Sequence, residues 1–167
     1  MASSVLEPVQ QRGREALQRL GLPTRRQEAW RLTDLKRLAA LADLPLSASP
    51  AKAEQPAVAT GVLRLRLDGL GDPLEGVTLP EGISALTDSE LRQALGHTLD
   101  RCGCADVWPV ELNHACSRRV LALRVRGSVP PLELLQTGSA GLTATRVLLL
   151  MEEKAQLDLL QVVTAQA

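Results

Sequence analysis

The spacing of apolar residues changes near Arg119, and this change limits the possible folds of the chain more than any other feature. Three stretches that follow it are bounded by Gly or Pro and show strand-like patterns: RVLALRVRG, PPLELLQTG and TRVLLLMEEKAQLDLLQVV. The runs VLLLM and LDLLQVV are nearly continuous, which is typical of strands buried on both faces. The last third of the chain is therefore predicted to consist of strands.

Two further expectations concern the last pair of predicted strands. Glu152, Glu153 and Lys154 fall between them, so we expect a hairpin turn there whose charges serve solubility. No covering layer follows in the sequence, so residues 142–163 are predicted to expose a strand edge. Such an edge can pair with another copy of the chain or with a partner.

The N-terminal residues instead show helical spacing. Residues 5–20 place apolar side chains on one face, and Gly21 followed by Pro23 ends that helix. Thr24 and Gln27 form a capping-box pattern, which predicts a short helix that begins directly after Thr24.

A further helix is predicted with Thr33 as its N-cap and Pro45 as its stop, so the first 45 residues form a set of helices. Residues 46–60 are rich in Ala, Ser and Pro without periodicity, which is linker composition. We place a domain boundary in this segment.

The segment after the linker combines one strand with two helices. Residues 63–67 alternate between Leu and Arg, which predicts a half-buried strand with Arg64 and Arg66 on its outer face. The same alternation predicts an outer face for Arg124 and Arg126. A capping-box pattern at Thr87 and Glu90 predicts a helix over residues 88–100. A second helix, over residues 106–117, is expected to bury four residues: Trp108, Leu112, Ala115 and Cys116.

Charge and aromatic content exclude several classes of function. The formal net charge is zero, so no general attraction to nucleic acids or membranes is expected. Basic residues gather in residues 12–37 and acidic residues in 68–111, which indicates two structural units. Phe and Tyr are absent, so the core must be aliphatic, and Trp30 and Trp108 are the only large aromatic rings.

The number of cysteines indicates the compartment. The chain has three, an odd number, and its first residues lack a signal-peptide pattern, which favours a reducing environment over a disulfide framework. No apolar stretch reaches the length of a membrane span. We therefore expect a cytoplasmic protein.

Five residues of metal-ligating types lie within about twenty positions, an arrangement that invites comparison with zinc and iron–sulfur sites: His97, Cys102, Cys104, His114 and Cys116. On a helix, however, His114 and Cys116 are two positions apart and point to different sides. The three cysteines stay as metal candidates. The interpretation we favour is ordinary thiols and solvent-facing histidines.

The arginines around Trp30 allow two interpretations. They could contact phosphates while the indole stacks on a base, in a small independent module that binds RNA or protein. We favour the solvated face of short helices, with Trp30 in their shared core and Leu22 and Leu35 as its neighbours.

No catalytic motif is found. The chain has no phosphate-binding loop of the GxxxxGK[ST] type, no GxGxxG, no HExxH and no GxSxG. We expect no catalytic residues and no enzyme.

The stretch GLPTRRQEAWRLTDL resembles the N-terminal signature of the SufD proteins, in the SufB/SufD family of the SUF iron–sulfur cluster assembly system. The matching residues are Gly21, Leu22, Pro23, Thr24, Arg26, Glu28, Trp30, Arg31, Thr33, Asp34 and Leu35. Leu32 departs from the signature, because the family has Tyr or Phe there. The segment ELNHA, with Leu112, Asn113 and Ala115, resembles the family's Leu-Asn-x-Ala helix.

The resemblance implies an α+β fold that leads into the first strands of a truncated right-handed parallel β-helix. The expected segments are an N-terminal helical region (1–45), a linker (46–60), a strand with helices (61–118) and the start of the β-helix core (119–167).

In function, the resemblance implies the N-terminal fragment of a non-catalytic scaffold subunit. Its partners would be SufB and the SufC ATPase, with no nucleic acid and no membrane. No cofactor is expected in this part, since the parent complex handles the iron–sulfur cluster. A homo-oligomer could form through the exposed strand edge.

Overall fold

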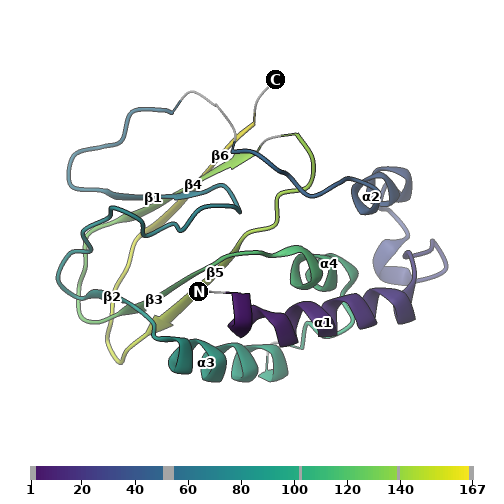
Figure 1. Ribbon diagram of the computed structural model, residues 1–167, viewed down its shortest axis with the longest axis horizontal. Coiled ribbons are helices and arrows are strands. Elements are labelled where there is room, and N and C mark those ends of the chain that lie inside the picture. The colour runs from purple at the N-terminus through teal and green to yellow at the C-terminus, as the bar shows by residue number, and fades with distance from the viewer. Residues whose placement is uncertain (1–2, 51–54, 102, 139, 166–167) are drawn as a thin grey trace.

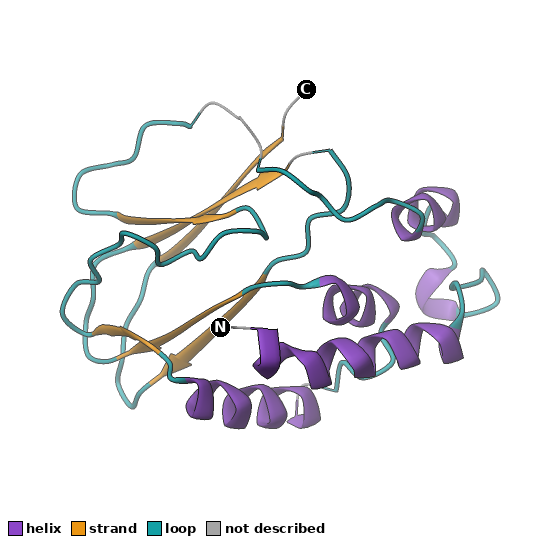
Figure 2. Cartoon of the chain, in the orientation of Figure 1, coloured by secondary structure: helices purple, strands orange, loops and turns teal. Residues whose placement is uncertain are grey.

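The computed structural model describes residues 3–50, 55–101, 103–138 and 140–165, and shows a mixed α+β fold (Figures 1 and 2). The α+β part of the expectation is thereby confirmed. The helices are α1 (Ser3–Leu20), the short 3₁₀ helix η1 (Glu28–Trp30), α2 (Leu35–Ala42), α3 (Asp88–Arg101) and α4 (Trp108–Cys116). The strands are β1 (Leu63–Leu67), β2 (Ile83–Ala85), β3 (Val120–Val125), β4 (Leu132–Gly138), β5 (Arg146–Met151) and β6 (Leu159–Ala165).

The strands form two sheets within the described residues. One has the order β1-β4-β6 and is parallel throughout. The other has the order β2-β3-β5, in which β2 is antiparallel and β5 parallel to β3. From β3 onward the chain passes from one sheet to the other with each strand.

The hairpin predicted at Glu152 to Lys154 is wrong, because β5 and β6 lie in different sheets. A turn does form there: the N–H of Ala155 donates to the Glu152 carbonyl at 3.0 Å, and Lys154 has a φ of 62°. This turn sends the chain to the opposite sheet. Charged turn residues indicate a reversal of the chain but not which strand the next one pairs with.

An aliphatic core fills the space between the two sheets. Leu65 and Leu67 of β1 pack there with leucines of β3 and β4, as the alternation in residues 63–67 predicts. Arg66 is exposed on the outer face, as predicted. Arg64 differs: its side chain is largely buried, and its Nε lies 2.5 Å from a carboxylate oxygen of Glu133.

The helices add a third layer on the outer face of the β2-β3-β5 sheet. Residues of α1 and α3 form an apolar cluster with Ala122 of β3: Val5, Leu6, Val9, Leu91 and Leu95. The result is an order of helices, sheet, sheet, which Figure 2 shows in profile. No helix of the described residues is long and apolar enough to cross a membrane.

The ends of the helices follow the predicted sequence signals in part. Gly21 ends α1 with a φ of 63°, and its N–H donates to the Leu17 carbonyl. The helix predicted directly after Thr24 is wrong, because only the 3₁₀ turn η1 forms there. The N-cap of α2 is Asp34, whose Oδ1 accepts from two backbone N–H groups, and not Thr33. Its carboxylate is the stronger acceptor.

Ser47, in the segment predicted as a linker, is fixed to the body of the protein. Its N–H donates to the Leu142 carbonyl at 3.0 Å, and its side chain contacts the Ala140 carbonyl and the Thr143 hydroxyl. Residues 55–60 are exposed, and residues 51–54 lie outside the described part. The predicted domain boundaries stay a prediction.

The end of the two-sheet stack formed by β5 and β6 is open in the described part of the chain. These strands hold outer positions in their sheets, which confirms the predicted strand edge. The predicted burial of both strands on both faces is wrong. β5 is half-buried up to an exposed Met151, and in β6 Leu159, Leu160 and Val163 are 49%, 55% and 67% exposed. In the described residues no further strand pairs with the outer edge of either strand.

Candidate functional site

A cluster of buried polar side chains lies where α4 meets α1 and β5. Its members, called the α4 cluster below, are the buried Glu111, His114 and Ser117 together with the half-buried Asn113 and Arg146. Within α4 the structure buries Trp108 with Glu111 and His114, whereas the other three predicted residues are half-buried. The prediction was wrong on this face because it was based on the spacing of apolar residues alone. That spacing does not show that Glu111 and His114 hydrogen-bond to each other and can therefore be buried.

Glu111 and His114 face each other inside this cluster. Oε2 of Glu111 lies 3.0 Å from Nδ1 of His114, and its Oε1 accepts from the N–H of Asp106 at 3.1 Å. Burial is the main reason that the pKa of His114 is lowered, although the bond to Glu111 opposes it. The imidazole is therefore neutral at neutral pH and donates from Nδ1 to the carboxylate. The prediction of a solvent-facing histidine is wrong for His114.

Asn113 joins α4 to β5. Its Nδ2 donates to the Thr145 carbonyl at 2.9 Å, and its Oδ1 accepts from Ser117 Oγ at 3.0 Å and Arg146 Nη2 at 3.2 Å. Gln10 of α1 donates to the Ser117 carbonyl at 2.7 Å, which extends the connection to a third element. Burial lowers the pKa of Arg146. These hydrogen bonds connect α4 with α1 and β5.

The metal candidates do not come together in the described part of the chain. Cys104 and Cys116 are half-buried, Cys102 lies outside the described residues, and so does the side chain of His97. Cys116 lines a cavity of about 10 Å³, and burial raises the pKa of its thiol, which makes it a poor ligand or nucleophile. Among the described residues no group of three His, Cys, Asp or Glu side chains could hold a metal ion.

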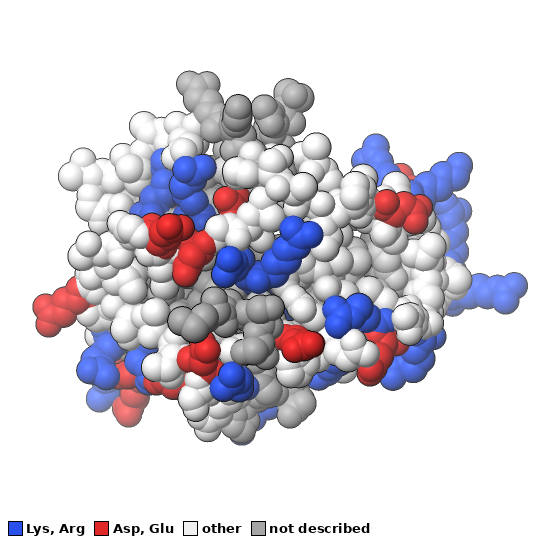
Figure 3. All heavy atoms as spheres, viewed as in Figure 1, with Lys and Arg blue, Asp and Glu red and all other residues white. Residues whose placement is uncertain are grey.

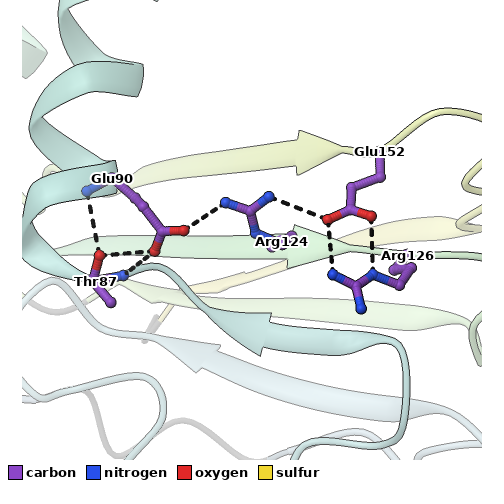
Figure 4. A network of polar contacts seen from close by, with 5 residues as sticks. All are labelled: Thr87, Glu90, Arg124, Arg126 and Glu152. Carbon is purple, nitrogen blue, oxygen red and sulfur yellow. Dashed lines mark hydrogen bonds and ion pairs between the residues drawn. The ribbon is translucent and has the colours of Figure 1, made fainter.

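A second polar network lies on the surface over β3 and the start of α3 (Figure 4). Glu90 caps the helix: its Oε2 accepts from the N–H and the hydroxyl of Thr87, each at 2.8 Å, as the capping-box pattern predicts. Its Oε1 accepts from Arg124 at 2.6 Å, while Glu152 accepts from Arg124 and from Arg126 at 3.1 and 2.9 Å. The alternation along β3 predicted that Arg124 and Arg126 lie on a solvated face. It did not predict that Glu90 and Glu152 are their hydrogen-bond partners.

These hydrogen bonds shift the pKa values of the carboxylates. The bonds from Thr87 hold the pKa of Glu90 below its usual range, and those from Arg126 and then Arg124 do the same for Glu152. Arg124 lines two open hollows of about 500 and 420 Å³. Both arginines that line the hollow of about 500 Å³, Arg124 and Arg126, are engaged by carboxylates, whereas Arg101 adds a further cation to the lining of the hollow of about 420 Å³.

The residues that carry the family resemblance lie mostly on the surface. Trp30, Thr33 and Leu35 are half-buried, as are Leu112, Asn113 and Ala115, and Pro23 is buried. The exposed members are Gly21, Leu22, Thr24, Arg26, Glu28, Arg31 and Asp34. Trp30 is thus not enclosed in a core, and its expected neighbour Leu22 is 48% exposed.

Charges of both signs mix over the body of the molecule, whereas Lys and Arg gather at the end where α2 lies (Figure 3). This end contains the signature residues.

Comparison of the chain with protein-family models, with curated proteins and with solved structures finds no match.

Proposed function

We propose that the chain forms the N-terminal part of a non-catalytic scaffold subunit of the SUF iron–sulfur cluster assembly system, similar to SufD. Its partners would be SufB and the SufC ATPase in the cytoplasm, and the nascent cluster would be the cargo of that complex. The observation that carries the proposal is the path of the strands from β3 to β6, which has the form expected for the first coil of a parallel β-helix.

Along this path, the number of sequence positions between paired residues is nearly constant. Val120 pairs with Arg146, 26 positions later, and Leu132 pairs with Leu159, 27 positions later. Both pairs are parallel and belong to different sheets. A chain that returns to each sheet after a fixed number of residues stacks its coils, as repeat architectures do.

The paired strands β4 and β6 also place side chains of the same type near one another. Thr137 of β4 is in register with Thr164 of β6. Gln161 of β6 is in register with Leu134, and its amide donates diagonally to Gln136 at 3.1 Å. Aligned like residues on adjacent strands are typical of stacked parallel strands. The hydroxyls of Thr137 and Thr164 have no hydrogen-bond partner among the described residues.

The open end formed by β5 and β6 supports a larger β-structure. It presents strand edges together with exposed Met151, Leu159 and Val163. A solenoid needs neighbouring repeats to bury its apolar faces, so these side chains fit a position beneath a further coil.

A test of the proposed role begins in the source cells. Disruption of the gene under iron limitation should lower the activity of an iron–sulfur enzyme such as aconitase several-fold, without change in the amount of aconitase protein. The intact gene should restore the activity, and a tagged copy of the full protein should co-purify with SufB and SufC. Unchanged aconitase activity together with no co-purification would contradict the role.

A further inference from the structure

Residues 22–44, called the signature lobe here, stand apart from the body of the protein. The whole lobe is described, and within it Pro23 is the one buried residue. Its hydrogen bonds to other described residues stay within the lobe or lie at its ends. Figure 1 shows α2 at the edge of the molecule, away from both sheets. The lobe therefore adds little to the core.

The apolar side chains of the lobe are unusually exposed for a folded segment. Leu32 is 93% exposed, and Leu22, Leu41 and Leu44 are 42–48% exposed. The eight-residue helix α2 has no buried residue, although helices this short need packing of an apolar face to be stable in water. Each of these leucines leaves apolar area in water, which a partner protein can cover.

The same lobe also carries exposed cationic side chains. Five cationic side chains of the lobe are exposed: Arg25, Arg26, Arg31, Lys36 and Arg37. Arg31 lies 3.5 Å from Glu28, and Arg37 lies 3.4 Å from Asp34. The other three cations have no ion pair within the described residues. The complementary surface must therefore be apolar with carboxylates at its rim.

Two other classes of ligand fit the lobe less well. Anionic membranes select clusters of four to eight cations, whereas the lobe also carries Glu28, Asp34 and Asp43, which such a surface repels. Single-stranded nucleic acid needs exposed aromatic rings for stacking, and the lobe offers Trp30, which is half-buried. Docking of an amphipathic helix from another protein requires apolar contacts and complementary charge, and the lobe offers exposed leucines and unpaired cations for both.

We propose that the signature lobe is a docking surface for a partner protein that presents an amphipathic helix, apolar on one face and flanked by carboxylates. The inference does not depend on the function proposed above, since it uses only the exposure and charge of the lobe.

The test uses a defined probe in place of the natural partner. A synthetic helical peptide of about 18 residues, with Leu at i, i+3, i+4 and i+7 and Glu elsewhere, is titrated into the isotope-labelled chain and followed by NMR. We expect saturable binding with shift changes confined to residues 22–44, and weaker binding as salt is raised. A matched peptide with Lys in place of Glu should bind at least about tenfold more weakly, a difference set by charge.

Variants separate the two parts of the surface. The double substitution Leu32→Ser with Leu41→Ser should weaken binding at least about tenfold, and so should Arg25→Glu with Arg26→Glu. Val58→Ser, which replaces a residue 44% exposed outside the lobe, should leave binding unchanged. Because the lobe contributes little to the core, all variants should keep the thermal unfolding of the parent.

Several results would overturn the inference. These are shift changes outside the lobe, equal affinity for the Lys peptide, an unaltered affinity in the leucine variant, or the absence of binding at millimolar peptide. Tighter binding of the same residues to phosphatidylglycerol vesicles or to a single-stranded RNA oligonucleotide would also overturn it. None of these outcomes depends on iron–sulfur enzyme activity, so the two proposals fail separately.

Discussion

The polar residues of the α4 cluster combine burial with nearly complete hydrogen bonding. Glu111 is 1% and His114 is 3% exposed, yet each has a partner within the cluster, so the cost of burying them is offset. Removing one partner would leave the other unsatisfied, which costs more than the bond itself contributes. At the scale of single residues, the buried pair of Glu111 and His114 therefore makes the fold sensitive to the loss of either partner.

We expect the stability of the protein to fall as pH drops below about 6.5, the ordinary pKa of histidine. Burial lowers the pKa of His114 in the folded protein, so the unfolded chain binds the proton more readily. Its contribution is full above the unfolded pKa and is lost as pH falls towards the folded value. The charged groups that face it are Glu111, Arg146 and Arg12.

Urea unfolding at pH 7.5 and 5.5 measures this effect. His114→Gln should lose less stability over that range than the parent does, and the comparison cancels the contribution of His97, which both proteins carry. Equal losses in the two proteins would show that His114 does not titrate in this way. Glu90 and Glu152 have lowered pKa values and lose their contributions at more acidic pH, near and below 4.5, so the two effects are separable.

At the scale of elements, the crossing of α1 and α4 depends on one glycine. A Cβ at Gly13 would lie 2.6 Å from the backbone N of Ala115 and 2.7 Å from Cβ of His114. Such distances mean that a larger residue must push the two helices apart. The close approach lets α1 cover the α4 cluster.

Gly13→Val should therefore destabilise the protein by about 1–3 kcal/mol, the usual cost of overpacking. Thermal and urea unfolding measure the change. Gln11→Val, at an exposed position of the same helix, is the matched control and changes helix propensity without a clash. A loss no larger than that of the control would show that the helices separate without cost.

At the scale of the whole molecule, the two sheets end in β1 and β2 at one side and in β5 and β6 at the other. The segment from β1 to β2 connects the two sheets, and β5 and β6 leave their outer edges unpaired in the described residues. From Leu159 to Ala165 the sequence of β6 has no charged residue. Edge strands without charges are prone to pair with other strands.

We accordingly expect this chain to self-associate through β6 at high concentration. Val163→Lys places a charge on the exposed edge and should weaken self-association at least about tenfold, a change that sedimentation equilibrium can measure. Val58→Lys is the control, because Val58 is exposed and lies outside the strands. A parent protein that remains monomeric near millimolar concentration would contradict this expectation.

Much of the fold follows from local patterns in the sequence. The alternation in β1, the Gly21 stop of α1 and the capping box at Thr87 with Glu90 were all predicted, because each depends on residues that are close in sequence. The strand edge was predicted for a similar reason, because long apolar runs form strands that need neighbouring elements to bury them. The residues after Thr24 were predicted as a regular helix from the capping-box pattern. Only the short 3₁₀ helix η1 forms there.

What the sequence by itself determined is therefore the kind and approximate position of most elements, since helix and strand periods are properties of neighbouring residues. Tertiary structure alone decided that β5 and β6 belong to different sheets and that Glu111, His114 and Arg146 meet in a buried cluster. It also left Leu32 and the signature lobe uncovered. The physical reason is that sheet partners and polar pairs are chosen by contacts between residues distant in sequence, which no local pattern records.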